Sequence, residues 1–109
     1  MSTRIVTEPT VEPLTLAEVK THLHEDLSDA SNDALITTLI AVARQDAEHR
    51  TQRALMLQTL EQTLDAFPVA TDTKPLAAIV LEMPPVVDVT SVTYTDAAGA
   101  TITLSNTLY

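Results

Sequence analysis

The sequence has no cysteine, a single glycine and no tryptophan, and each of these shortages excludes a kind of chemistry. Without cysteine the chain cannot form disulfides, thiol nucleophiles, thiolate zinc sites or iron–sulfur clusters. One glycine in 109 residues cannot build the glycine-rich loops that hold nucleotide phosphates. Aromatic residues make up 3% of the chain, which is too few for a platform on which nucleic-acid bases stack.

Positive charge is also scarce. The chain has 6 Lys and Arg against 15 Asp and Glu, a formal net charge of −9. Proteins that bind nucleic-acid phosphates need clustered Lys and Arg, so this surface is not expected to bind them. No apolar run approaches the ~20 residues of a membrane span, and the polar segment 1–13 does not resemble a signal peptide. We therefore expect a protein made in the cytoplasm, with no membrane partner.

The three histidines and the carboxylates show no catalytic or metal-binding pattern. His22 and His24 are two residues apart, so on a helix they point about 200° from each other and cannot chelate one ion. His49 has no Ser or Cys at a spacing that indicates a nucleophile and its base. The carboxylates are scattered, and none stands in a context that indicates acid–base catalysis. We expect no catalytic residue, no cofactor site and no metal site.

The length predicts one domain, and 45% apolar residues are enough for one core. Residues 1–13 are rich in Thr, Glu and Pro and show no periodic pattern, which predicts an extended N-terminal arm. Such an arm is either a loose terminus or a segment that orders against a neighbouring subunit. Residues 14–109 are expected to form the single domain.

A helix is predicted over residues 15–27. Thr15 and Glu18 form the pattern of a capping box, in which each side chain bonds to the other residue's backbone amide. An apolar stripe follows at helical spacing, made by Leu16, Val19, Leu23 and Leu27.

A second, central helix is predicted over residues 32–53, with Ser31 or Asn32 as its N-cap. Its broad apolar face is the expected core: Leu35, Ile36, Leu39, Ile40, Val42, Ala43 and Ala47. Near its C-terminal end, Arg44 is four residues before Glu48, and Asp46 is four residues before Arg50. These pairs are expected to lie either in solvent or at an interface.

Beyond residue 55 the pattern changes to that of strands, predicted over residues 58–67, 78–82, 86–95 and 101–104. Gly99 is expected to adopt the left-handed conformation that closes a hairpin between the last two. The predicted fold class is α+β, with N-terminal helices followed by a small antiparallel sheet or hairpin.

Several segments together resemble the head–tail connector (adaptor) proteins of tailed bacteriophages, the gp6-like group, also found in prophages and gene transfer agents. The segments that carry the resemblance are Leu14 to Leu23, Asn32 to Ile36, Glu48 to Leu55, Gln58 to Leu60, Leu64 to Pro68, Leu81 to Val86 and Val89 to Asp96. Where the family often has Thr-Gly-Arg, this chain has Thr51-Gln52-Arg53, so the helix is expected to end less sharply there.

The resemblance implies a structural protein and not an enzyme. Its partners would be further copies of itself in a ring (expected to be a dodecamer), the portal protein above, and the next neck or tail-completion protein below. Double-stranded DNA would pass through the channel at the head–tail junction of the virion, without sequence-specific binding and past an acidic lumen that repels it. In such a ring, Arg44, Glu48, Arg50 and Arg53 are candidate contacts with neighbouring subunits or the portal.

A second hypothesis comes from the charge alone. An acidic module with no recognisable site could bind a basic partner, or occupy a nucleic-acid site as a DNA mimic. A mimic should be a monomer or dimer that binds a basic enzyme, whereas a connector should form rings and bind a portal.

Overall fold

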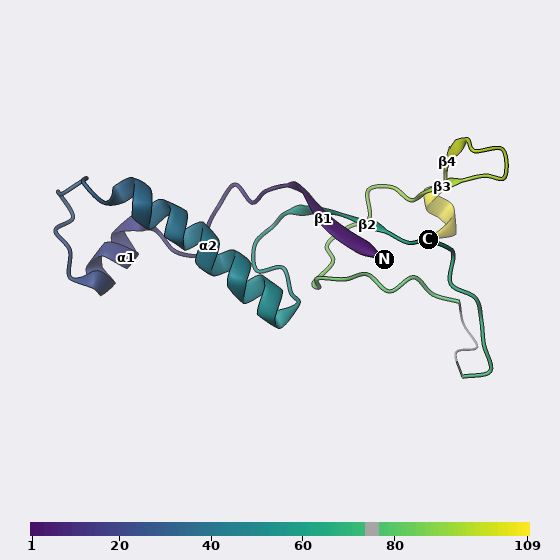
Figure 1. The fold of residues 1–109 in the computed structure, drawn as a ribbon, viewed down its shortest axis with the longest axis horizontal. Coiled ribbons are helices and arrows are strands. Elements are labelled where there is room, and N and C mark those ends of the chain that lie inside the picture. Colours follow the sequence, from purple (N-terminus) through teal and green to yellow (C-terminus); the bar gives the residue numbers. More distant parts are fainter. Residues whose placement is uncertain (74–76) are drawn as a thin grey trace.

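The computed structural model describes residues 1–73 and 77–109. Helices and strands are both present, which confirms the α+β class, although a strand precedes the helices. In chain order the elements are β1 (Ser2–Thr7), α1 (Leu16–Leu23), α2 (Asp33–Thr51), β2 (Thr59–Thr63), β3 (Thr93–Thr95), β4 (Thr101–Thr103) and the 3-10 turn η1 (Asn106–Leu108). Figure 1 shows the two helices at one end of a long molecule and the strands at the other.

Helix α1 begins as the sequence predicts. The Thr15 hydroxyl accepts a hydrogen bond from the Glu18 amide at 3.2 Å, and the Thr15 amide donates to the Glu18 carboxylate at 2.8 Å. The predicted end at residue 27 is wrong, because the helix stops at Leu23 with His24 in the left-handed conformation. The Asp26 carboxylate then accepts the Ser28 amide at 2.9 Å, a local turn that competes with further helix.

Helix α2 is the longest element, and both its first and its last residue lie within two residues of the predicted range 32–53. Asn32 is its N-cap, and Gln52 ends it in the left-handed conformation (φ 53°) without the help of glycine. The expected core is partly wrong: of its apolar residues, only Ile36 and Ile40 are buried. Leu35, Leu39 and Val42 are exposed, because no other helix or strand of the described chain covers that side.

The N-terminal segment, expected to be an extended arm, contains a paired strand. Strand β1 lies antiparallel to β2, with Ile5 opposite Leu60 and a register shift before Thr7. The β-branched side chains of this segment, Thr3, Ile5, Val6 and Thr7, favour a strand even without alternation. Strand β2 is shorter than the predicted 58–67, and Arg4 forms a cross-strand ion pair with Glu61 at 2.8 Å.

The predicted C-terminal hairpin is present, as strands β3 and β4 pair with Tyr94 opposite Ile102. Gly99 has φ 84°, and the Asp96 carboxylate accepts the Ala98 and Ala100 amides at 2.8 and 2.9 Å. The strand predicted over residues 86–95 is reduced to Thr93–Thr95 and that over 101–104 to Thr101–Thr103.

The strand predicted over residues 78–82 does not form. Its backbone bonds to a side chain of β2 instead of to another strand. The Gln62 amide group donates to the Val80 carbonyl at 2.9 Å and accepts the Glu82 amide at 3.0 Å. One side-chain amide thus takes the place of a peptide group and holds this extended segment beside β2.

The molecule is too elongated to bury its apolar side chains. Its radius of gyration is 19.8 Å and its principal extents are 60 × 32 × 22 Å, whereas a compact chain of this length has a radius of gyration of about 13 Å. Its accessible surface is 8628 Å², against about 5,900 Å² for a compact monomer of this mass. Roughly 2,700 Å² of additional surface therefore faces solvent in the isolated subunit.

Candidate assembly surface

Arg44, on the inner face of α2, is the centre of one network of buried and half-buried charges. Its guanidinium donates from Nε to Glu12 at 2.8 Å, from Nη1 to Glu48 at 2.8 Å and from Nη2 to Glu8 at 3.4 Å. The hydrogen bond to Glu12 outweighs the opposing effect of burial and raises the pKa of Arg44. Because Glu8 and Glu12 lie in the N-terminal arm, this one cation fixes the path of the arm along the helix.

Glu48 extends the same network in the other direction. Its second carboxylate oxygen accepts the Leu55 amide at 2.8 Å and the Gln58 side-chain amide at 2.9 Å. These bonds attach the chain between α2 and β2 to the end of the helix. Arg44 and Glu48, both predicted as interface residues, thus lie buried inside one subunit and bond to its own segments.

The other two predicted interface residues lie at the surface. Arg50 is exposed and pairs with Asp46 at 2.9 Å, one helical turn away on the solvent side of α2. Arg53 is also exposed and follows the left-handed residue Gln52, where its backbone amide donates to the Glu48 carbonyl at 3.3 Å. The structure therefore divides the four residues into an internal pair and an external pair.

Sequence analysis did not single out Lys20 as a structural residue, although it is as deeply buried as Arg44. Its ammonium group donates to the Asp29 carbonyl and pairs with the Asp33 carboxylate. These contacts fix the loop between the two helices. The sequence did contain an indication of this burial, because Lys20 is four residues after Leu16 and therefore lies on the same side of α1 as its apolar stripe.

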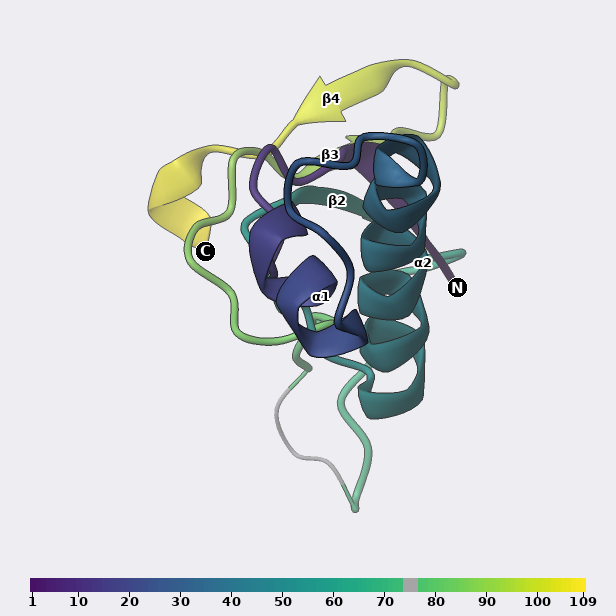
Figure 2. The same ribbon diagram turned by 90° about the vertical axis from the view of Figure 1, so that its left-hand side faces the viewer.

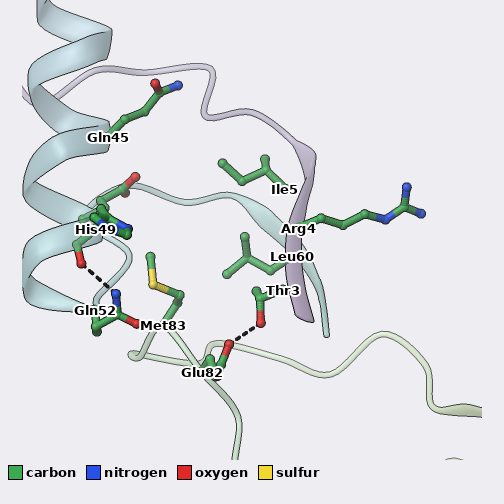
Figure 3. Close-up of a pocket in the computed structure, with 10 residues that line it drawn as sticks. Thr3, Arg4, Ile5, Gln45, His49, Gln52, Leu60, Glu82 and Met83 are labelled. Carbon is green, nitrogen blue, oxygen red and sulfur yellow. Dashed lines mark hydrogen bonds between the residues drawn. The ribbon is translucent and has the colours of Figure 1, made fainter. Parts of the chain in front are cut away.

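A hollow of about 380 Å³ lies where the helical end meets the strands (Figure 3). In Figure 3 the apolar side chains of Ile5, Leu60 and Met83 face the space between the strands and α2, and Gln45 and His49 project from the helix. No strand in the described part of the chain packs directly against α2. The helical end is thus held to the rest of the subunit largely by the arm and by the Glu48 bonds.

Neither a metal centre nor a membrane segment is found in the parts described. Within residues 1–73 and 77–109, no three His, Asp or Glu side chains are grouped so that they could hold a metal ion. No helix in these same ranges has both the length and the hydropathy needed to cross a bilayer.

A family model described as phage gp6-like head-tail connector protein matches residues 13–83. The chain belongs to this family. The matched part of this connector protein contains α1, α2 and β2, and therefore also Arg44, Glu48 and Lys20. Comparison with curated proteins and with solved structures gives no match.

Membership of this family makes the chain a structural component of the phage head–tail connector. The family is a structural one and not a known enzyme family. Connector proteins assemble with other head and tail proteins of the virion, which places this protein at the head–tail junction.

Proposed function

We propose that this connector protein forms a ring beneath the portal, and that the ring joins the DNA-filled head to the next neck or tail component. The family match over residues 13–83 carries the connector role. The ring is supported by the surface of the subunit. A subunit that exposes roughly 2,700 Å² more than a compact monomer has area for two neighbours at about 800 Å² each.

Closed rings need two different faces on each subunit, one for each neighbour. The elongated shape provides faces that are far apart, at the helical end and at the strand end (Figure 1). In this assembly Arg44 and Glu48 act from within, by holding the arm and the α2–β2 connection in place. Arg50 and Arg53 remain the candidate cationic contacts with a neighbouring subunit or the portal.

DNA passage through the ring is part of the same proposal, and the placement of two of the cations supports it. Lys20 and Arg44 are buried against carboxylates of their own subunit, so neither can line a channel as a free cation. With a net charge of −9 on each copy, we expect an acidic channel wall, which would repel the phosphate backbone and leave DNA free to move. The expected ring is a dodecamer, matched to the portal.

The experiment is negative-stain imaging and mass measurement of the protein mixed with the portal protein of the same phage. Protein alone and portal alone serve as controls. A ring stacked coaxially on the portal supports the proposal, and the measured mass gives the subunit number. Binding to a basic nucleic-acid enzyme instead, with no ring on the portal, would favour the acidic binding module.

A further inference from the structure

Helix α2 has one broad apolar face, and its own subunit buries only part of it. The inner face carries the buried Ile36 and Ile40. Next to it around the helix, centred about 110° away, Leu35, Leu39 and Val42 are 59%, 53% and 51% exposed. At about 100° per residue these three lie within roughly 60° of one another and form one stripe, here called the outer stripe.

More than half of the surface of each residue in the outer stripe faces solvent in the isolated subunit. Helix α1 is the only helix or strand in the described part of the subunit that contacts α2. Figure 2, seen along the long axis, shows α1 on one flank of α2 and leaves the other flank at the edge of the molecule. An amphipathic helix packs its apolar face against a partner, so the part of that face left exposed by its own subunit indicates a further partner.

The charge around the outer stripe points to a second copy of this chain as that partner. Two copies that each carry −9 repel one another, so close contact between them is favoured where the facing surfaces are neutral or complementary in charge. Residues 34–43 of α2 contain no charged side chain. Beyond them, the charged residues on the side of the outer stripe are Asp46 and Arg50, which form an ion pair with no net charge. The outer stripe is therefore surface on which repulsion between copies is smallest.

The area agrees with this choice. The roughly 2,700 Å² of additional surface exceeds the ~1,600 Å² that two standard contacts take from one subunit. We propose that the outer stripe, Leu35, Leu39 and Val42, packs against the adjacent copy in the assembled connector. This inference rests on the proposed ring, and it names the face through which each subunit meets its neighbour.

Since the chain has no cysteine, one cysteine introduced at a chosen site gives a single attachment point for a photo-crosslinker. Leu39→Cys places the probe on the outer stripe. Ala34→Cys is the matched control, because Ala34 is also exposed on α2 but lies about 100° around the helix from Leu35. Both labelled variants are irradiated in the ring bound to the portal, and the products are identified by mass.

The expected result is a product of twice the subunit mass from Leu39→Cys and far less of it from Ala34→Cys. A product that joins Leu39→Cys to the portal would overturn the proposal and assign the outer stripe to the portal. Equal dimer yields from both positions, or no product from Leu39→Cys, would also overturn it. If no ring forms on the portal with the wild-type chain, the proposed function itself fails, which is a separate outcome.

A substitution tests the same contact by affinity. Leu39→Glu adds one negative charge to the outer stripe, and Ala34→Glu adds the same charge beside it. Ring formation on the portal should weaken by at least about 30-fold for Leu39→Glu, the effect that marks a central contact residue, and little for Ala34→Glu. Circular dichroism should show both variants folded, since both sites are exposed in the subunit. Equal effects at the two sites would contradict the proposal.

Discussion

At the scale of single residues, Arg44 joins the arm to α2 through Glu8 and Glu12, and it also pairs with Glu48 on its own helix. Arg44→Met would leave the buried Glu48 carboxylate without its cation. We expect a loss of about 3–5 kcal/mol in the free energy of unfolding, because breaking a buried pair leaves an uncompensated charge. Urea unfolding followed by circular dichroism measures this loss.

Arg50→Met is the matched control for Arg44→Met, since Arg50 is also an arginine of α2 with a partner four residues away. Its pair with Asp46 is exposed, so the expected loss is below about 1 kcal/mol. Similar losses for the two variants would show that the Arg44 network does not hold the subunit together.

Glu18 gives the capping box a pH dependence. Hydrogen bonds from the Thr15 amide and hydroxyl lower the pKa of Glu18 below its ordinary 4.5. A carboxylate with a depressed folded-state pKa adds stability above its unfolded pKa, and this stability is lost as pH falls through the folded-state value. Glu18→Gln should therefore be less stable than wild type at neutral pH, and the difference should vanish in acid.

Urea unfolding of both proteins at a series of pH values between about 7 and 3 tests this prediction. The glutamine retains an acceptor for the Thr15 amide, so the comparison isolates the charge. A stability difference that stays constant over the whole range would mean that the Glu18 charge does not act through the cap.

At the scale of elements, the β3–β4 hairpin depends on one backbone conformation. A Cβ at Gly99 meets no atom within 4 Å, so Gly99→Ala is opposed only by the positive φ of 84°. We expect Gly99→Ala to destabilise the hairpin by about 1–2 kcal/mol, and Gly99→Asn to cost less because asparagine tolerates this conformation. Cross-strand NMR contacts between Tyr94 and Ile102 report on the hairpin. Equal losses with Ala and Asn would point to a cause other than backbone strain.

Elements specified by neighbouring residues could be predicted from the sequence. The capping box at Thr15 and the hairpin turn at Gly99 rest on contacts within a few residues. The sequence also predicts the start of α2 at Asn32, although the Asn32 side chain makes no capping hydrogen bond. The pairing of β1 with β2 could not be predicted, because Ile5 and Leu60 are far apart in the chain and neither segment specifies its partner.

The candidate site shows the same division. The spacing of Arg44 and Glu48 predicts that they pair, and they do, at 2.8 Å. Their burial depends on Glu8 and Glu12 reaching across from the arm, which no local pattern indicates. The assumption that every apolar residue of α2 belongs to one core failed for Leu39 for a related reason: the sequence does not say which elements lie beside a helix.

At the scale of the whole molecule, the subunit has the surface of an assembly component. Buried apolar side chains in the described ranges are limited to Ile36 and Ile40, while large apolar side chains are exposed along both ends. The buried positions are otherwise held by the charged residues Lys20, Arg44 and Glu48. Charges and hydrogen bonds fix the shape of the subunit, and its apolar surface remains available to neighbouring proteins.

Hydrogen exchange tests most directly whether assembly covers that surface, with the protein measured alone and bound to the portal. The account predicts new amide protection in α2 around the outer stripe and in segment 77–92, where the side chains of Val80 and Val87 are 75% and 79% exposed in the isolated subunit. Unchanged protection in α2 and in residues 77–92, despite a stable complex, would contradict the claim that neighbouring subunits bury the exposed apolar surface.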